Sequence, residues 1–454
     1  SITEAERADE SKTARHQRFQ EALLAILLIC FLTPCDCGPK MDQVTGLSND
    51  FHSDAVVYAP RPAVKSTEIA DTMSTALKPS KGPKSVPQKP NPYPAWSPRF
   101  WHGMTVADWA GLVLRNRLAL DPRRYHVALG VSVFTVLNSF MKRLQDWRHG
   151  AEIARTQVEH DPIFIVGHWR SGTTYLHELL SLDDRFASPT TYQCFAPHHF
   201  LLSEDLVTRY GNFLLPHRRP MDNVDAGWSR PQEDEFALCI LGAPSPYLRM
   251  AFPNRDAPHL DMLNMDDVDE AVRDQWRAAF EQNVRLLTYR HQKQLIMKSP
   301  PHTGRVELLS QMYSRARFIH IVREPYTLFA SSRRLWKSLD DVQGLQVPRH
   351  EQLDEYILEA MERMYHGFQS QRARMDSSKI FDIHYEDLVV DPVGQLAAAY
   401  ESLDLGDFKR VAPLIEAETA RQVEYKTNHY ELPVETKRQV RQRWSMYFEE
   451  YGYD

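Results

Sequence analysis

The segment 162–177 holds the residues of this chain that are best suited to chemistry. It reads as a short apolar strand, a turn with Gly167 and Gly172, and a helix that begins at Thr173. Such a turn directs backbone N–H groups and the positive end of a helix toward one point, which suits a phosphate. The glycines are spaced as in a phosphate loop, but Thr173 stands where an NTPase has its lysine. Because Arg170 supplies the cation instead, we expect a nucleotide phosphate bound without that lysine and without magnesium.

A second polar turn follows the apolar segment 317–322. Arg323 lies at the carboxyl end of this predicted strand, and Ser331 lies eight residues later in a helix that begins near Pro325. In open α/β sheets, ligands bind beyond the carboxyl ends of the strands. Two phosphate-type sites at two strand ends indicate a nucleotide with two separated phosphates.

These turns resemble the nucleotide site of sulfotransferases that use 3′-phosphoadenosine 5′-phosphosulfate (PAPS). The Arg-Ser-Gly-Thr-Thr segment 170–174 is similar to the 5′-phosphosulfate loop of the bacterial and tyrosylprotein-type branch of that family. Further similar segments are 296–302, around a strand-end lysine, and 385–392, and the motifs follow the family order from about 160 to 430. The resemblance implies that PAPS is the co-substrate, bound by Arg170, Ser171, Gly172, Thr173, Thr174, Arg323 and Ser331.

The resemblance further implies in-line transfer of a sulfuryl group to a hydroxyl acceptor, which needs positioning and charge stabilisation. Lys298, at a strand end, is expected to stabilise the bridging oxygen. His302, four residues later, and Glu233, in an acidic cluster, are the candidate bases. Each has a structural alternative, a core histidine for His302 and an exposed helix start for the acidic cluster. Where some relatives have an acid after the loop, this chain has Gln193, so that role does not carry over.

Other functions remain open at this point. A P-loop nucleotide kinase or phosphotransferase is the first alternative, and a non-catalytic, membrane-associated nucleotide-binding protein is the second.

In a polar segment near the C-terminus, Lys426 or Asn428 could contact the 3′-phosphate, or the segment could be a solvated loop. The acceptor could be a hydroxyl-bearing small molecule, a lipid or a glycan, and the sequence does not indicate the oligomeric state.

Composition narrows the choice of partners. The chain has 454 residues, 43% of them hydrophobic, which is enough for a sizeable core. Its net charge of −6 implies no broad basic surface, so we expect no nucleic-acid partner. Five cysteines form neither a disulfide framework nor a zinc pattern. The adjacent pair His198 and His199 is poorly arranged to share one ion, so we expect no metal.

The first 95 residues differ from the rest and are predicted to be a poorly ordered segment that ends in a Pro/Lys-rich linker. The apolar run Ala22–Thr33 fits a signal or membrane tether, a disordered extension, or residues before a true start at Met41. Residues 96–454 are predicted to form one sulfotransferase domain. This domain would comprise a helical extension at 96–160 and an α/β core at 161–454.

The predicted fold class is α/β, a P-loop-like three-layer α/β/α arrangement with a central parallel sheet. An insertion at 185–265, rich in aromatic residues and proline, is expected to lie over the strand ends like a lid and to form the acceptor pocket. The expected strands are 162–167, 294–299, 317–322 and 380–385. The expected helices are 105–118, 173–182, 268–290, 303–313, 325–338, 351–373 and 393–403.

The uncharged stretch Tyr125–Met141 allows three interpretations. It fits a core helix, a helix that lies on a membrane surface, or a membrane span that its small polar residues make unfavourable. In the second case, the basic residues that flank it would give a peripheral membrane contact through 123–143. We therefore expect a cytoplasmic protein, with membrane association through this segment as the alternative.

Overall fold

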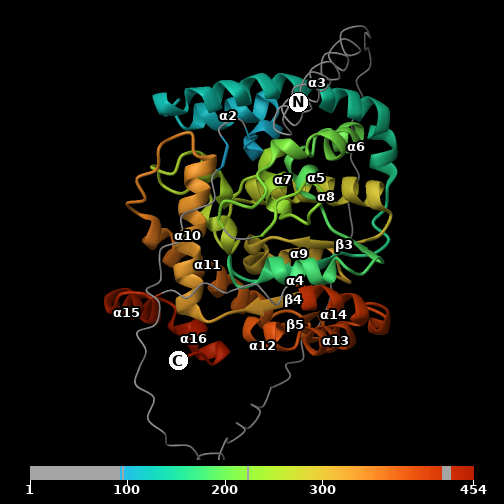
Figure 1. Cartoon of the computed structure of the whole chain (residues 1–454), viewed down its shortest axis with the longest axis vertical. Helices are drawn as coiled ribbons and strands as arrows, with labels where there is room; N and C mark the ends of the chain where they lie inside the picture. Colours follow the sequence, from blue (N-terminus) through green and yellow to red (C-terminus); the bar gives the residue numbers. More distant parts are fainter. Residues whose placement is uncertain (1–92, 95–96, 222–223, 422–430) are drawn as a thin grey trace, which may run out of the picture. The chain divides into compact units, whose positions relative to one another are not determined.

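The computed structural model describes residues 93–94, 97–221, 224–421 and 431–454 (Figure 1). Contacts divide the chain into two units, Ser1–Pro87 and Gln88–Asp454, and the described residues all belong to the second. Lys426 and Asn428 lie outside the described residues, as does the apolar run Ala22–Thr33.

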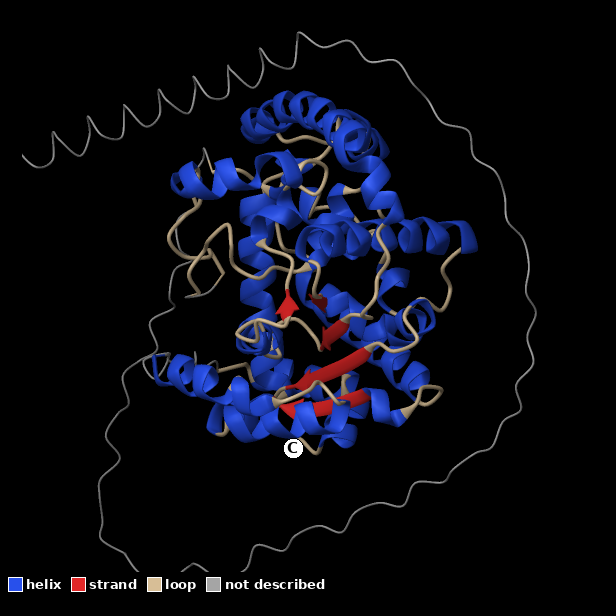
Figure 2. Cartoon of the chain, turned by 90° about the vertical axis from the view of Figure 1, so that its right-hand side faces the viewer, coloured by secondary structure: helices blue, strands red, loops and turns tan. Residues whose placement is uncertain are grey.

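Five parallel strands form the sheet in the order β2-β3-β1-β4-β5 (Figure 2). Their bounds are β1 Ile163–Val166, β2 Phe186–Ala187, β3 Gln294–Lys298, β4 Arg317–Val322 and β5 Ile380–His384. The four expected strands are confirmed to within one residue at each end. The two-residue edge strand β2 was not predicted, because two residues are too short for a period to show.

The register of the strands places the functional turns at one edge. Ile165 on β1 is opposite Lys298 on β3, and Val166 on β1 is opposite His320 on β4. The carboxyl ends of these three neighbouring strands are therefore nearly level. Since parallel strands all end at the same edge, the turns that follow them lie beside one another.

Side chains on the strands alternate between two separate apolar clusters. On β1, Ile163 and Ile165 belong to a cluster with the helices α4 (Thr173–Leu180), α13 (Pro392–Leu403) and α14 (Ala412–Arg421). Phe164 and Val166 belong to a larger cluster with the helices α8 (Glu270–His291), α9 (Val306–Met312) and α11 (Leu353–Arg372). Both faces are buried, which accounts for the unbroken apolar sequence of this strand. The domain is therefore a three-layer α/β/α fold, as expected.

Helices, joined by loops and turns, surround the sheet (Figure 1). The α-helices are α2 Val106–Arg115, α3 Tyr125–Arg155, α4 Thr173–Leu180, α5 Thr191–Phe195, α6 Phe200–Tyr210, α7 Asp234–Ile240, α8 Glu270–His291, α9 Val306–Met312, α10 Pro325–Gln343, α11 Leu353–Arg372, α12 Tyr385–Val390, α13 Pro392–Leu403, α14 Ala412–Arg421, α15 Val434–Arg443 and α16 Ser445–Tyr451. The 3-10 helices are η1 Phe100–Gly103, η2 Pro122–Arg124, η3 Asn212–Leu214, η4 Pro246–Ala251, η5 Leu260–Leu263, η6 Pro300–Arg305, η7 Ser377–Lys379 and η8 Phe408–Arg410.

The region 185–265 is built differently from a simple lid. It contains the helices α5, α6 and α7, and many of its aromatic side chains are buried in the larger cluster. It therefore supplies part of the core as well as the wall of a cavity described below. The expected helix 303–313 is also corrected, since it begins as η6 and continues as α9 after a kink at Gly304.

The helix α3 extends well beyond the apolar stretch that suggested it. Of the described residues, only the segment Pro122–Arg155 is long and apolar enough to cross a membrane, and a third of its most apolar window is buried. The core-helix interpretation therefore holds for one face of α3, while the other face is exposed. Figure 1 places α2 and α3 at one end of the domain, away from β5.

Candidate active site

The turn between β1 and α4 has the backbone of an anion-binding loop. Gly167, Arg170 and Gly172 have φ values of +146°, +72° and +108°. At Gly172, an added Cβ would lie 2.4 Å from the ring of Tyr385, so only glycine fits there. The first N–H groups of α4 have no partner within the helix and are directed into the turn. The loop backbone therefore suits an anion, and anion binding at this loop stays a prediction.

The two predicted phosphate turns meet at one point. Arg170 Nε donates a hydrogen bond to Ser331 Oγ at 2.9 Å, and an Arg323 terminal nitrogen donates to the Arg170 carbonyl at 3.0 Å. The Arg323 guanidinium also lies 4.1 Å from the centre of the Tyr385 ring. Two guanidinium groups from two strand ends are thus held together, which gives a region of positive charge suited to phosphates.

The remaining loop residues have different surroundings. Ser171 is fully buried, and its hydroxyl donates a hydrogen bond to the His168 carbonyl at 2.8 Å. Burial of His168 lowers its pKa to about 4, so its ring is neutral at pH 7. Thr173 is buried at the start of α4, and Thr174 lines a cavity. Ser171 therefore closes the turn, and Thr174 is the hydroxyl of the loop that faces the cavity.

Lys298 and Glu233 form an ion pair at the end of β3. Lys298 Nζ donates to a Glu233 carboxylate oxygen at 2.9 Å, and the lysine side chain is almost fully buried. The other carboxylate oxygen accepts a hydrogen bond from the Tyr247 hydroxyl, which accepts one from Trp169 Nε1 at 2.7 Å. Burial and the Glu233 charge raise the pKa of Tyr247 well above its usual value, so its hydroxyl stays protonated. The carboxylate is therefore oriented from two sides.

Three consecutive acids at the start of α7 bind the end of β3 and η6. Next to Glu233, Asp234 accepts hydrogen bonds from Ser299 at 2.9 Å and His302 at 2.7 Å. Glu235 pairs with the fully buried Arg305 at 2.7 Å. The alternative of an exposed helix start is therefore wrong, because Asp234 and Glu235 are fully buried.

His302 lies in the core and not in the cavity. Its side chain is fully buried, and the rings of Phe164, Trp276 and Phe280 surround it edge to face. Burial alone would raise the pKa of Asp234, but His302 and Ser299 hold that pKa below its usual value. The structure does not bring His302 to a position that an acceptor can reach, which leaves Glu233 as the candidate base that faces the cavity.

An apolar cavity of about 120 Å³ lies between the loop and the region 185–265. The polar part of its wall includes Thr174, Glu233 and Glu178, whose pKa is raised by burial. Its other polar lining residues are Thr191, Arg219, Asp225, Arg230, Gln232 and Gln343. Apolar side chains dominate the remainder of the wall, among them Trp169, Phe195, Leu215, Met221, Phe236, Tyr247, Leu335 and Leu339. The cavity therefore joins the candidate base to an apolar surface.

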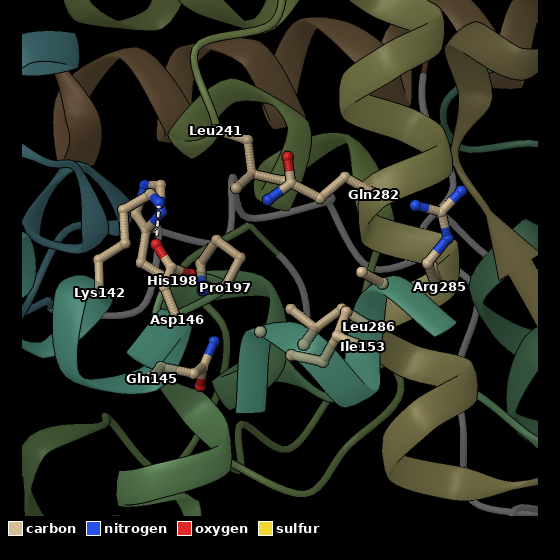
Figure 3. Close-up of a pocket in the computed structure, with 12 residues that line it drawn as sticks. Lys142, Gln145, Asp146, Ile153, Pro197, His198, Leu241, Gln282, Arg285 and Leu286 are labelled. Atoms are coloured by element: carbon tan, nitrogen blue, oxygen red, sulfur yellow. Dashed lines mark hydrogen bonds and ion pairs between the residues drawn. The ribbon is translucent and has the colours of Figure 1, made fainter. Parts of the chain in front are cut away.

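A larger cavity, of about 230 Å³, lies elsewhere, between α3 and α8 (Figure 3). Lys142 and Asp146 are paired at its edge, and Arg285 extends from α8 on the other side. None of the predicted site residues lines it, so we assign the chemistry to the smaller cavity.

Sequence reasoning missed His177, Trp169 and Tyr247. His177 is buried one turn into α4, and neither of its ring nitrogens forms a hydrogen bond with a described residue. Burial, followed by the nearby Lys298 charge, lowers its pKa well below the usual value. Nothing in the sequence distinguished these residues from ordinary core residues. Within the described ranges, no three His, Cys, Asp or Glu side chains form a group that could hold a metal ion.

Comparison with known proteins decides the family. The model of the sulfotransferase family matches residues 162–409, more than half of the chain. The chain belongs to the sulfotransferase family. It is an enzyme that transfers sulfuryl groups, and the kinase alternative is not favoured.

Two curated relatives of this sulfotransferase are each 39% identical to it over 359 residues, which cover 79% of the chain and 92% of the relative. Both are called omega-hydroxy-beta-dihydromenaquinone-9 sulfotransferase Stf3, one from Mycobacterium bovis and one from Mycobacterium tuberculosis. Two crystal structures share the fold. Sulfotransferase STF9 from Mycobacterium avium has a TM-score of 0.58 at 16% identity, covering 78% of this chain and 97% of that one. Sulfotransferase STF1 from Mycobacterium tuberculosis has a TM-score of 0.54 at 19% identity, and the match covers 75% of this chain and 92% of that one.

Proposed function

We propose that this sulfotransferase transfers the sulfuryl group of PAPS to a hydroxyl group on a long apolar lipid. The observation that carries the proposal is the cavity of about 120 Å³, whose wall contains Thr174 of the loop, Glu233 and a majority of apolar side chains. A reactive carboxylate at the end of an apolar cavity suits an acceptor that carries its hydroxyl at the end of a hydrocarbon chain.

The nucleotide would be held at both of its phosphate groups. Arg170 and the first N–H groups of α4 suit the 5′-phosphosulfate, and Arg323 with Ser331 suits the 3′-phosphate. The residues proposed for the two phosphates lie close together, because the carboxyl ends of β1 and β4 are nearly level. Lys426 stays a prediction, since it lies outside the described residues.

The transfer step assigns one role to each partner of the ion pair. The acceptor oxygen attacks sulfur while the bond from sulfur to the bridging oxygen breaks, and adenosine 3′,5′-bisphosphate leaves. Glu233 takes the acceptor proton, and the Lys298 ammonium stabilises the charge that develops on the bridging oxygen. Tyr247 holds the second oxygen of Glu233, so the carboxylate keeps one oxygen directed toward Lys298 before the acceptor binds.

The class of the acceptor is inferred from the cavity and from the relatives. The curated relatives are named for a hydroxylated menaquinone, which is an isoprenoid lipid. The apolar wall formed by Leu335, Leu339 and Phe236 favours the same class here over a glycan, whose hydroxyl groups would lose their hydrogen bonds to water.

The acceptor class is tested by incubating the full chain with PAPS labelled in its sulfate and with matched acceptors. We expect label to enter an ω-hydroxylated isoprenoid quinone, and no label to enter the same quinone without the hydroxyl. A higher kcat/KM for a phenol or a monosaccharide than for the hydroxylated lipid would contradict the proposed acceptor class.

A further inference from the structure

The face of α3 that points away from the domain is apolar. Leu129, Val133 and Val136 are 68%, 63% and 63% exposed, and Trp147 is 72% exposed. With Tyr125, which is 55% exposed, these residues recur at intervals of three or four along the helix or at multiples of that interval, so they form one stripe. Helices of soluble proteins normally turn such a stripe toward the core.

The opposite face of α3 packs on the domain through apolar and polar side chains together, namely Val127, Ala128, Val131 and Met141 with Thr135, Asn138 and Gln145. Asn138 donates to the Met104 carbonyl at 2.9 Å, and its other amide atom lies 3.1 Å from His199. Gln145 accepts a hydrogen bond from the Leu201 backbone N–H at 3.0 Å. The helix thus buries hydrogen-bonded amides beside a few apolar side chains, and it leaves several branched aliphatic side chains exposed on its outer face, where water does not favour them.

Positive charge surrounds the apolar stripe. Between residues 114 and 148 there are seven arginine or lysine residues and two aspartates, a net charge of +5 in a chain whose overall net charge is −6. Both aspartates are paired, Asp121 with Arg123 at 2.9 Å and Asp146 with Lys142 at 2.5 Å. Tyr125 and Trp147, near the two ends of the stripe, are residue types that prefer the boundary between hydrocarbon and water.

The helix α2 extends the exposed apolar surface. The Val106 backbone N–H donates to Ser139 at 2.9 Å and Trp109 Nε1 donates to Ser132 at 2.9 Å, so α2 runs antiparallel to α3. The segment that leads from α2 to α3 carries Leu118, which is exposed beside the basic Arg117. The apolar surface therefore includes more than one element, and Figure 1 shows both helices at the same end of the domain.

We propose that this surface, the exposed stripe of α3 with the end of α2 and the basic residues around it, docks on an anionic lipid bilayer. The apolar side chains would enter the boundary between headgroups and acyl chains, and the arginine and lysine side chains would bind lipid phosphates. The helix lies on the bilayer and does not cross it, because its polar face is held by the domain. A second copy of the chain is a poorer occupant, because two faces of charge +5 would repel each other.

The docking surface is joined to the wall of the active-site cavity. Arg124, at the start of α3, donates to the Asp341 carbonyl at 3.0 Å, and Trp101 donates to the Gln343 carbonyl at 2.8 Å. The cavity is lined by Gln343 itself and by Leu339, which lies one turn earlier in α10. Docking through α3 would therefore hold the cavity near the bilayer, where a lipid acceptor is found.

The proposal is tested by co-sedimentation of the full chain with vesicles, which requires neither PAPS nor turnover. Vesicles of equal parts phosphatidylcholine and phosphatidylglycerol are compared with phosphatidylcholine alone, at low and high salt. We expect binding to the anionic vesicles that weakens with salt, and a loss of roughly tenfold or more in the variant L129Q/V133Q/V136Q. The matched control V389Q/V390Q/V434Q changes exposed valines outside α2 and α3 and should bind like the unaltered chain.

A second variant protects the test against misfolding. R117E/R143E/R148E reverses exposed charges around the stripe and leaves the apolar residues in place, so it should also lose binding while its melting temperature is unchanged. Vesicle binding that is equal in both variants and the unaltered chain would overturn the proposal, as would a dimer that the first variant dissociates without any vesicle binding. Docking with no sulfuryl transfer would contradict the proposed function alone.

Discussion

Two neighbouring carboxylates at the start of α7 differ in what surrounds them. Glu233 and Asp234 are neighbours, and both bind the segment that follows β3, yet one carboxylate lines the cavity and the other is enclosed with His302 among aromatic rings. A base must come within hydrogen-bond distance of the acceptor hydroxyl. Access therefore separates a catalytic role for Glu233 from a structural role for His302.

Replacement of Lys298 by alanine tests the charge at the bridging oxygen. We expect kcat to fall by about 10²–10³, because a preorganised cation at the developing charge is lost. The dissociation constant of adenosine 3′,5′-bisphosphate should change little, since Arg170 and Arg323 hold its phosphates. Steady-state kinetics and calorimetric titration measure the two quantities. Lys409→Ala, at an exposed position on η8, is the control, and an unchanged kcat in Lys298→Ala would refute this role.

The base is tested by comparing Glu233→Gln with His302→Gln. Glu233→Gln keeps the shape of the side chain and removes the proton acceptor, so we expect kcat per folded molecule to fall by about 10²–10⁴. The melting temperature should fall as well, because the buried Lys298 ammonium loses its counter-charge. His302→Gln disrupts a buried pair, so we expect a loss of about 1–3 kcal/mol in the free energy of unfolding. Its turnover per folded molecule should survive.

Thermal melts and rates normalised to folded protein measure both variants. The reverse outcome, a stable His302→Gln protein without turnover and an active Glu233→Gln protein, would return the role of base to His302.

At the scale of elements, the junction of β1, the loop and α4 depends on two glycines with positive φ. Gly172→Ala combines an unfavourable backbone conformation with a clash against Tyr385, so we expect weaker nucleotide binding and a lower melting temperature. Gly452→Ala is the matched control, because Gly452 also has a positive φ, of +69°, but its added Cβ meets nothing within 4 Å. Equal effects of the two substitutions on nucleotide affinity would contradict the requirement for close approach at Gly172.

The sequence predicted the strands that carry the site because both faces of the sheet are buried. Segments such as 163–166 are therefore continuous apolar runs. Arg170 and Arg323 lie in the polar turns that follow β1 and β4, and Lys298 is the last residue of β3. The region 185–265 could not be predicted in the same way. Its helices are short, and their aromatic residues are placed by contacts with distant elements and not by a local period.

The choice between Glu233 and His302 also depended on information that one sequence lacks. Both residues stand beside polar neighbours in the chain, and only the packing of Phe164, Trp276 and Phe280 encloses the histidine. For α3, the sequence showed the apolar stretch but not which face would be buried, because polar Asn138 and Gln145 have partners on α6 and on the segments that precede α2 and α6.

At the scale of the whole molecule, several buried histidines make stability depend on pH. Burial lowers the pKa of His102, His168, His199 and His291 to about 4, below the value of 6.5 in an unfolded chain. Between pH 6.5 and 4, the unfolded chain therefore binds more protons than the folded one, and acidification favours unfolding. Each residue contributes at most about 2 kcal/mol by pH 5.

The melting temperature should accordingly fall as the pH decreases from 7 to 5. Burial also raises the pKa of Glu178 and Asp341, which favours folding at acidic pH. These two carboxyl groups stand against eight described histidines with a lowered pKa, since the pKa of His177, His198, His259 and His320 is lowered too. Differential scanning calorimetry across this range measures the effect. A melting temperature that stays constant or rises between pH 7 and pH 5 would show that these histidines are not neutral in the folded protein.

The whole account depends on one nucleotide site made by two strand ends, and binding of adenosine 3′,5′-bisphosphate tests it most directly. Thermal unfolding is measured with this nucleotide, with adenosine 5′-monophosphate and with Mg-ATP, for the unaltered chain and for Arg323→Ala. At a hundred times its dissociation constant, a ligand adds about 2.7 kcal/mol. The account predicts that the bisphosphate stabilises most, and that Arg323→Ala weakens the bisphosphate far more than the monophosphate. The account would be contradicted if Arg323→Ala weakened binding of the bisphosphate and the monophosphate equally, or if Mg-ATP alone stabilised the unaltered chain.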